Sequence, residues 1–591
     1  MVIKTETMRT KIFALILISC MAILLISLAC IQVGWHERYR VMSEGNRLRV
    51  VSLMAPRGCI FDRNGDGLVK DVLCFNVSVI YSRIKDMDSL ADVLSSVLEV
   101  PRGEIAADIK KSREQPYSPV CVAADVGIEK AIHLEESGAD YPGLLLEVSA
   151  KREYIHGNTA SNTLGYVGCI NRSEFETLKH YGYQINDLVG RDGIEKYYDE
   201  YLRGRHGGKQ IEVDHRGRKV LTLGFREPSP GKDLYLTIDL ELQKFCEELL
   251  ENKKGAILAM DPEDGAILAM ASAPAYDPNI FVSRTRRQEI NDLLKNRDYP
   301  LLNRAIGGAY PPGSIFKIIV ATGALETGVA TQETAFNCPG YFTLGRATFH
   351  CWRESGHGML VLKEGIKNSC NVYFFNLGLL LGVDRISAFA KEFGFGACTG
   401  IDLPGETPGT VPTRNWKKKR FGENWYKGDT VNYSIGQGYL LCSPLQIVRM
   451  MSVFANGGYL VKPYVVEKIG GIPVSSGARI DLNISPGSLE IIRDALRKVV
   501  NDPRGTGMKA RLDNVVVAGK TGTAQTSKEK NHGWFAGFAP FEKARLAVVV
   551  FDEYGGKGGY YAAGTGGRVF QKAEELGLLS GDRDQPAEDR D

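Results

Sequence analysis

The sequence predicts an α+β protein with one N-terminal transmembrane helix and two domains outside the membrane. Three observations lead to this prediction. The chain has 591 residues, more than a single compact domain usually contains. A long apolar run without a charged residue lies at 12–33. In the C-terminal half, strand-like segments lie at both ends with helical patterns between them, which favours an antiparallel sheet flanked by helices.

The composition is that of a globular protein, with 44% hydrophobic and 24% charged residues. The 73 basic and 70 acidic residues nearly cancel and leave a net charge of +3. A dedicated nucleic-acid-binding protein shows a concentrated basic surface, so no nucleic-acid partner is expected.

The apolar run Ile12–Val33 is long enough to span about 30 Å of hydrocarbon as a helix. Lys4, Arg9 and Lys11 precede it, and positive residues favour the cytoplasmic side. We therefore expect a cytoplasmic tail at 1–11 and a retained anchor at 12–33. A cleaved signal peptide is the alternative, but the run is longer than a typical signal and no A-x-A site ends it.

The rest of the chain divides at Pro228–Lys232, where Pro and Gly interrupt any regular element. We expect a non-catalytic domain at 34–232, a catalytic domain at 233–575 and a polar C-terminal tail at 576–591. The catalytic domain is predicted to begin with a strand at Leu234–Thr237 and a helix capped by Asp239.

Further strands are predicted from short apolar runs. Ala256–Met260 and Ala266–Met270 flank a turn that contains Asp-Gly, which indicates a β-hairpin. Val515–Val517 and Ala547–Phe551 predict two more strands near the C-terminus.

Three short motifs carry candidate chemistry. In Ser314-Ile315-Phe316-Lys317, a serine and a lysine three residues apart share one face of a helix. An unassisted serine is a poor nucleophile near neutral pH and needs a base. Burial and a second nearby cation lower the pKa of a lysine, so that its neutral amine can serve as that base.

The second motif, Ser369-Cys370-Asn371, offers a hydroxyl that can relay a proton and an amide that can bind a substrate carbonyl. The third, Lys520-Thr521-Gly522-Thr523, offers a second cation and two hydroxyls that can bind a carboxylate. Gly522 leaves room for a substrate backbone beside a strand. A lone S-x-x-K or S-x-N is common and a lone K-T-G is scarcer, but all three in this order are typical of penicillin-recognising serine enzymes.

The surroundings of these motifs resemble class B penicillin-binding proteins, most closely those of the elongation type. The likeness covers about 55–563, and its segments are Arg57–Gly65, Gly193–Lys196, Asn303–Lys317, Gly356–Gly358, Pro412–Trp416, Trp425–Thr430, Ile435–Gly438, Ser443–Gln446, Gly519–Gln525 and Trp534–Gly537. It implies an elongated non-catalytic pedestal, or dimerisation-type domain, followed by a transpeptidase domain of the penicillin-binding and β-lactamase-like fold.

The resemblance also implies roles for individual residues. Ser314 would attack the penultimate D-alanine of a peptidoglycan stem peptide, Lys317 would take its proton, and Ser369 would pass a proton to the departing D-alanine. Asn371 would orient the peptide. The terminal carboxylate would be held by Lys520, Thr521 and Thr523. The backbone N–H groups of Ser314 and Thr523 would form the oxyanion hole.

The expected function is therefore D,D-transpeptidation in cell elongation and shape maintenance, with β-lactams as covalent inhibitors. The chain would be a single-pass protein of the bacterial inner membrane with its catalytic domain outside the cytoplasm. No segment resembles a glycosyltransferase, so the resemblance implies a RodA-like membrane glycan polymerase as partner. Catalysis would need no cofactor.

Four residues around the second motif form a metal-ligand pattern. Cys338, Cys351, His357 and Cys370 are spaced C-x12-C-x5-H-x12-C, and three thiolates with one imidazole suit a closed tetrahedral zinc site. Relatives of the elongation type resemble this chain in having metal-ligand-type residues here. Three alternatives stand: a Cys338–Cys351 disulfide, buried unbonded cysteines, and His350 as ligand in place of His357.

Other functions compete. A β-lactamase shares the first half-reaction, but the Glu-x-x-Leu-Asn of class A enzymes is missing from the sequence. A D,D-carboxypeptidase differs only in letting water replace the acceptor amine. A β-lactam sensor usually needs more membrane segments than the one seen here. An inert scaffold would not need all three motifs.

Overall fold

The computed structural model describes residues 2–40, 48–111, 113, 116, 119–137, 141–184, 187–213, 219–283, 286–474, 477–526, 530–556 and 558–580. Most of the predicted polar tail at 576–591 lies outside these residues. Two compact units divide the chain. The first comprises Met1–Pro56, Leu73–Ala150 and Gly204–Pro230, and the second comprises Arg57–Val72, Lys151–Arg203 and Gly231–Asp591.

The chain begins with helix α1 (Val2–Ala29), which continues as the π-helical turn η1 (Cys30–Gly34). The stretch Thr10–Gly34 is long and apolar enough to cross a membrane, and none of it is buried against the described protein. Large side chains such as Phe13 and Leu24 are more than half exposed. These properties are consistent with the predicted single-pass anchor at 12–33.

The first unit contains a three-stranded antiparallel sheet and a smaller helical layer. The sheet has the order β1-β8-β9, with bounds β1 (Leu48–Leu53), β8 (Gly207–Val213) and β9 (Lys219–Arg226). From Leu73 onward, β3 (Gly67–Val79) pairs with β4 (Val120–Val126) and β5 (Leu144–Tyr154). The helices and the short helical turn are η2 (Tyr81–Arg83), α3 (Met87–Leu98), α4 (Arg102–Lys111) and α5 (Ile128–Ser137). Their apolar faces share a small core with Val77 and Val79.

The second unit begins with short elements that precede the predicted catalytic domain. Strand β2 (Ile60–Phe61) pairs with the start of β3 and with β10 (Leu234–Leu236), which also pairs with β18 (Val466–Ile469). The other early elements are α6 (Ser161–Leu164), β6 (Val167–Cys169), α7 (Arg172–Leu178), η4 (Lys179–Tyr181), β7 (Leu188–Gly190), α8 (Gly193–Tyr197) and α9 (Asp199–Leu202).

A buried ion cluster joins two of the segments that carry the family likeness. Glu195 accepts hydrogen bonds from Arg57 at 2.7 Å and from Arg152 at 2.7 Å. Arg57 also binds Asp199, and Arg152 binds Asp71. These two segments are identified from the sequence only by their likeness to the family, and the structure supplies a physical reason for their charged residues.

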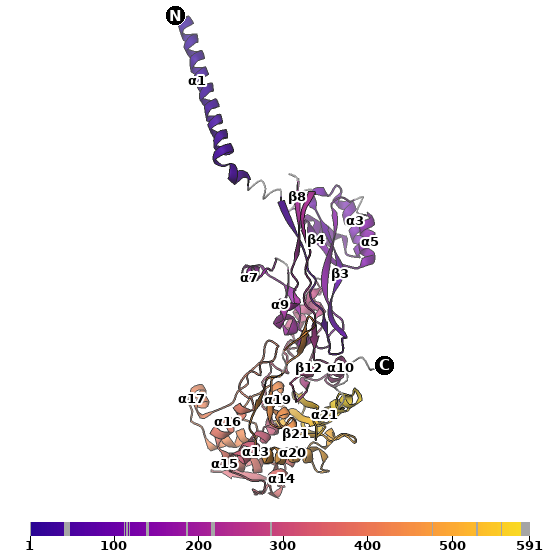
Figure 1. Ribbon diagram of the computed structural model, residues 1–591, viewed down its shortest axis with the longest axis vertical. Helices are drawn as coiled ribbons and strands as arrows, with labels where there is room; N and C mark the ends of the chain where they lie inside the picture. The colour runs from indigo at the N-terminus through magenta and orange to yellow at the C-terminus, as the bar shows by residue number, and fades with distance from the viewer. Residues whose placement is uncertain are drawn as a thin grey trace. The chain divides into compact units, whose positions relative to one another are not determined.

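The main sheet of the second unit is antiparallel, with strand order β12-β11-β23-β22-β21. Its edge strands β12 and β21 are labelled in Figure 1. Its strands are β11 (Gly255–Met260), β12 (Ile267–Ala273), β21 (Ala518–Ala524), β22 (His532–Ala539) and β23 (Leu546–Asp552). Helices α10 (Leu240–Leu249) and α21 (Gly558–Glu575) pack together on it, and α19 (Pro444–Ala455) contacts β11, β22 and β23. Because every residue of β11 and β22 is buried, both sheet faces are covered, and the predicted sheet between helices is confirmed.

The predicted hairpin and helix cap are also confirmed. Strands β11 and β12 pair around the turn at Asp261–Gly265. Asp239 caps α10 by accepting a hydrogen bond from the backbone N–H of Leu242 at 3.0 Å.

The predicted strand at Val515–Val517 is wrong. The strand in this region is β21 (Ala518–Ala524), so the Lys520–Thr523 motif lies inside a strand and does not follow one. Backbone pairing decides the boundary, because the ladder with β22 begins at Ala518 opposite Phe538. Valines favour strands, but they form one only where a partner strand is available.

The remaining elements of the second unit are mainly helices and short hairpins. The helices and helical turns are α11 (Asn279–Val282), α12 (Arg287–Lys295), η5 (Gly313–Ile315), α13 (Lys317–Glu326), α14 (Leu362–Lys367), α15 (Asn371–Leu381), α16 (Val383–Glu392), α17 (Arg414–Phe421), α18 (Lys427–Ser434), α20 (Pro486–Asn501) and η6 (Met508–Ala510). The short strands are β13 (Phe336–Cys338), β14 (Tyr341–Leu344), β15 (Ala347–His350), β16 (Gly358–Leu360), β17 (Tyr459–Val461), β19 (Ile472–Pro473) and β20 (Arg479–Asp481).

Candidate active site

Ser314 lies in the tight helical turn η5, beside strand β21. Gly313 has a φ of +55°, and a Cβ there would lie 2.6 Å from the carbonyl oxygen of Thr523. Its backbone N–H donates to the carbonyl of Gly436 at 3.0 Å. Only glycine fits this approach without strain. The turn therefore holds the partly exposed Ser314 against the strand that carries the third motif.

Lys317 is fully buried at the start of α13. Its ammonium donates to the Ser369 carbonyl at 2.8 Å and to the Asn371 side chain at 2.8 Å, and it lies 3.5 Å from the Ser369 hydroxyl. Burial lowers the pKa of Lys317 to about 8, although the nearby Cys370 and Cys351 act in the opposite direction. A lysine with this pKa is partly neutral near pH 7.5, as a general base requires.

Lys520 reaches the same hydroxyl from β21. Its Nζ donates to Ser369 Oγ at 2.9 Å and to the carbonyl of Thr521 at 2.9 Å. Burial, followed by the charge of Lys317, lowers the pKa of Lys520 well below its usual value. The Ser369 hydroxyl thus lies between two buried amines, and the three motifs predicted from the sequence meet in one place.

The direct Ser314–Lys317 contact expected from helical spacing is not among the hydrogen bonds of the described residues. The bonds of Lys317 go to the second motif instead. Hydrogen bonds between catalytic groups are often long in an unliganded enzyme and tighten when substrate binds. The role of Lys317 as the base for Ser314 stays a prediction.

The residues of the third motif that are predicted to bind substrate differ in the exposure of their side chains. Thr523 is exposed on β21, whereas Thr521 is buried and its hydroxyl donates to Thr506 at 3.1 Å. Gly522 faces Trp534, and a Cβ at this glycine would lie 3.1 Å from the Cβ of that tryptophan. Among the three residues, Thr523 is the one whose side chain is open to a ligand.

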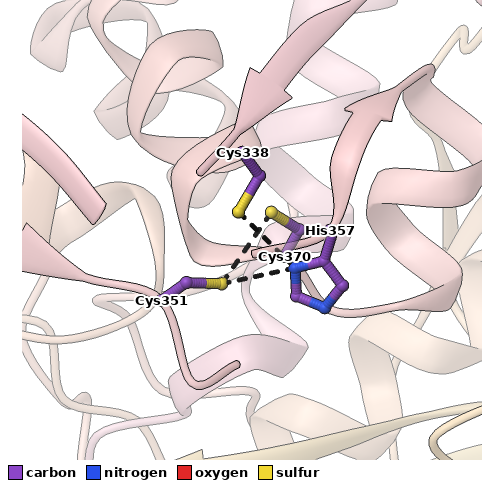
Figure 2. Close-up of side chains that lie close together, drawn as sticks. All are labelled: Cys338, Cys351, His357 and Cys370. Carbon is purple, nitrogen blue, oxygen red and sulfur yellow. Dashed lines mark hydrogen bonds between the residues drawn. The ribbon is translucent and has the colours of Figure 1, made fainter. Parts of the chain in front are cut away.

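The candidate metal ligands converge, as Figure 2 shows. One ligand atom from each of Cys338, Cys351, His357 and Cys370 lies within 4.8 Å of the others. His357 Nδ1 lies 3.5 Å from the sulfurs of Cys338 and Cys351, and the sulfurs of Cys351 and Cys370 are 3.9 Å apart. None of the twelve cysteines forms a disulfide, so the Cys338–Cys351 disulfide is absent from this structure.

The donor set fits a tetrahedral metal ion. Zinc–sulfur and zinc–nitrogen bonds of about 2.3 and 2.0 Å give S–S edges of about 3.8 Å and S–N edges of about 3.5 Å, close to the distances above. Hydrogen bonding from Cys370, and then from His357, lowers the pKa of the Cys351 thiol, and contact with Cys351 raises that of Cys370. His350 is not among the residues whose ligand atoms converge here.

The loop around Cys351 also contacts the second motif by hydrogen bonds that sequence reasoning missed. The indole N–H of Trp352 donates to the carbonyl of Asn368 at 3.0 Å, and Asn371 donates to the carbonyl of His350 at 3.3 Å. Ser369 itself has a φ of +51°, a left-handed conformation that costs a non-glycine residue energy. These bonds flank the strained residue and help to hold it in place.

Comparisons with known proteins agree with this geometry. The family model described as "Penicillin binding protein transpeptidase domain" matches residues 255–573, and that described as "Penicillin-binding Protein dimerisation domain" matches residues 52–236. The chain is 34% identical to "Peptidoglycan D,D-transpeptidase MrdA" of Haemophilus influenzae, over 94% of this chain and 90% of the relative.

Two solved structures are also similar. "Complex between Penicillin-Binding Protein (PBP2) and MreC from Helicobacter pylori" aligns with a TM-score of 0.80 and 30% identity, over 90% of this chain and 100% of that chain. "Structural coordination of polymerization and crosslinking by a peptidoglycan synthase complex" aligns with a TM-score of 0.74 and 31% identity, over 98% of this chain and 99% of that chain.

Proposed function

The chain belongs to the penicillin-binding protein transpeptidases, and on this premise we propose that it cross-links peptidoglycan as a D,D-transpeptidase of cell elongation. The observation that carries the proposal is the Ser369 hydroxyl between the buried amines of Lys317 and Lys520, beside the Ser314 turn. This arrangement suits proton transfer in acyl exchange, and it needs no cofactor.

In the proposed reaction, Ser314 Oγ attacks the carbonyl of the penultimate D-alanine while its proton passes to the neutral amine of Lys317. The oxyanion that forms is bound by the backbone N–H groups of Ser314 and Thr523. Collapse of the intermediate breaks the peptide bond, and Ser369 delivers a proton to the departing D-alanine. The amine of a second stem peptide then attacks the acyl-enzyme, releases Ser314 and completes the cross-link.

Substrate binding is proposed to use the third motif and the amide of the second. Lys520 and Thr523 bind the terminal carboxylate, with Thr521 supporting Thr523 on the strand. Asn371 orients the stem peptide. The stem peptide is proposed to lie along β21. Gly522 keeps this strand close to Trp534, because a Cβ at the glycine would lie 3.1 Å from the Cβ of that tryptophan.

The test is labelling of the detergent-solubilised protein with a fluorescent penicillin, with Ser314→Ala beside the wild type. We expect a covalent band that persists for hours and is absent from the variant. A band that fades within minutes would indicate a hydrolase such as a β-lactamase, and a wild type that never labels would indicate an inert scaffold. Incubation with a stem pentapeptide and an acceptor amine distinguishes transpeptidation from carboxypeptidation, because only the former yields the cross-linked product.

We also propose that α1 anchors the chain as a single pass in the bacterial inner membrane, with the catalytic domain outside the cytoplasm. The chain has no segment resembling a glycosyltransferase, and one similar chain was solved in a peptidoglycan synthase complex. A RodA-like membrane glycan polymerase is therefore the proposed partner. Its absence from the protein purified gently from membranes would contradict this partner.

The cluster of Cys338, Cys351, His357 and Cys370 is proposed to hold a structural zinc ion. When bound, the ion supplies a rigid link between the Cys351 loop and Cys370, the middle residue of the second motif. Purified protein should contain about one zinc per chain and protect Cys338 and Cys351 from alkylation. Cys351→Ser should lose the metal, and the exposed Cys398→Ser should keep it. Protein without zinc whose Cys338 and Cys351 alkylate freely would overturn the site.

A further inference from the structure

Helix α17 lies at the edge of the second unit (Figure 1). With neighbouring residues it forms an exposed surface of aromatic and basic side chains. The rings of Trp416, Phe421 and Tyr439 contact one another, with centroid distances of 5.2 to 5.6 Å. Tyr426 adds a fourth ring beside Lys417, whose Nζ lies 4.8 Å from its centroid. Phe421 is 50% exposed and Tyr426 is 61% exposed. Aromatic side chains that are exposed together in one patch often mark a binding surface.

The cations of α17 fall into two groups. Lys417 is buried and pairs with Asp429 at 2.7 Å, and Arg414 pairs with Asp384 at 3.1 Å. Lys418, Lys419 and Arg420 are exposed, and none of them pairs with a carboxylate among the described residues. Glu423, the nearest exposed acidic residue along the chain, forms an ion pair with Lys417 at 3.5 Å.

The cations and the rings lie side by side on the helix. Lys418 and Phe421 are three residues apart, and Trp416 and Arg420 are four apart, so each pair shares a face. The helix macrodipole favours cations in the last turn, but it gives no reason for exposed rings among them. A ligand with apolar faces and negative charges gives a reason for both.

The surface adjoins the active site through one short segment. The side chain of Gln437 donates to the carbonyl of Thr523 at 3.4 Å, and Tyr439 follows two residues later. Farther along, the backbone of Cys442 exchanges hydrogen bonds with that of Tyr310, four residues before Ser314. The segment that carries Tyr439 therefore contacts both the rings of α17 and the strand of the third motif.

We infer that this aromatic–basic surface (Trp416, Lys418, Lys419, Arg420, Phe421, Tyr426 and Tyr439) binds a glycan strand of the wall whose stem peptides carry free carboxylates. The inference rests on the proposed function, and it adds a region outside the active site that binds the glycan part of the substrate. Sugar rings pack their C–H faces on the exposed aromatic side chains, and the carboxylates pair with the three free cations. Because exposed ion pairs are individually weak and screened by salt, binding depends on several pairs together and falls as ionic strength rises.

The experiment measures binding of soluble, uncross-linked glycan strands to the full-length protein in detergent. The test variants are the triple Lys418→Glu, Lys419→Glu, Arg420→Glu and the single Phe421→Ala. The matched control reverses three exposed lysines elsewhere in the same unit: Lys295→Glu, Lys391→Glu and Lys543→Glu. Two further ligands show where the negative charge comes from. Glycan strands with amidated carboxylates test the stem-peptide carboxylates, and vesicles of anionic phospholipid test lipid headgroups.

We expect the triple variant to bind strands at least about fivefold more weakly than wild type, with Phe421→Ala also weakened and the control variant unchanged. Amidated strands should bind wild type as weakly as the triple variant binds native strands. Penicillin labelling of Ser314 should stay within about twofold in all variants, since α17 carries none of the reacting groups.

Equal binding by wild type and the triple variant, equal loss in the control, or a preference for phospholipid vesicles over strands would each overturn the inference. Loss of Ser314 labelling in the wild type would instead overturn the proposed function, so the two failures are distinguishable.

Discussion

Replacing Glu195 by glutamine should destabilise the protein strongly although this residue takes no part in the chemistry. Glu195 is 0% exposed, and its two oxygens each accept a charge-assisted hydrogen bond, from Arg57 and Arg152 at 2.7 Å. Burial alone would raise the pKa of Glu195, but Arg152 and Arg57 outweigh it and the net shift is downward. For Arg57, burial would lower the pKa, and the carboxylates of Glu195 and Asp199 reverse that effect.

The size of the loss follows from what the substitution leaves behind. The variant Glu195→Gln keeps the shape but removes the only negative charge that both buried guanidinium groups share. Arg57 keeps Asp199 and Arg152 keeps Asp71 as partners, but the amide NH2 of the glutamine faces one of the two guanidinium groups, donor to donor. Losing a buried hydrogen bond to a charged group in this way costs about 1.5–3 kcal/mol. Glu174 provides a matched control, because it pairs with Arg191 at 2.6 Å but is partly exposed. Such pairs contribute little to stability, because water and salt screen them.

Thermal unfolding of the detergent-solubilised variants measures the difference. We expect the melting temperature of Glu195→Gln to fall by on the order of 5 °C or more and that of Glu174→Gln to change little. The folded fraction of both should still be acylated by fluorescent penicillin. Equal losses of stability in the two variants would refute the reasoning that burial sets the contribution of this cluster.

Three further predictions follow from the geometry of the second unit. The penicillin acylation rate should rise about fivefold between pH 7 and pH 8, because burial lowers the pKa of Lys317 to about 8 and only its neutral amine accepts a proton. Glu247→Gln should raise the melting temperature at pH 8 but not at pH 4.5. Burial raises the pKa of Glu247 from 4.5 to about 7 in the folded protein. The protonated carboxyl therefore contributes to the stability of the folded protein below pH 4.5, and this contribution is lost as the pH rises through 7. Trp352→Phe keeps an aromatic side chain but removes the indole N–H that donates to the carbonyl of Asn368. The variant should acylate about two- to fivefold more slowly, because the turn at Ser369 is held less firmly.

Each of these predictions has its own control. A flat or falling pH profile would contradict the assignment of Lys317 as base. For the stability measurement, the exposed neighbour Glu248→Gln should show no pH-dependent gain. For the acylation measurement, Trp425→Phe removes an indole hydrogen bond to Thr430, and an equal slowing in this variant would mean that Trp352 acts through general stability.

The sequence by itself determined the features that depend on neighbouring residues. The long apolar helix α1 follows from an uninterrupted apolar run, the β11–β12 hairpin from two apolar segments and a turn, and the cap of α10 from one aspartate. The catalytic motifs could also be identified, because their residue types and order restrict the chemistry. The spacing of Cys338, Cys351, His357 and Cys370 indicated a metal-ligand group, although His350 remained an alternative.

Only the tertiary structure decided which distant groups meet. Lys520 and Ser369 are 151 residues apart in the chain, and they contact because β21 and the turn before α15 pack together. The same packing excludes water, and that exclusion lowers the pKa of Lys317. It also selects His357 over His350 and places the Lys520–Thr523 motif inside a strand. These outcomes depend on burial and on backbone pairing between remote segments, and neither is encoded in the local order of residues.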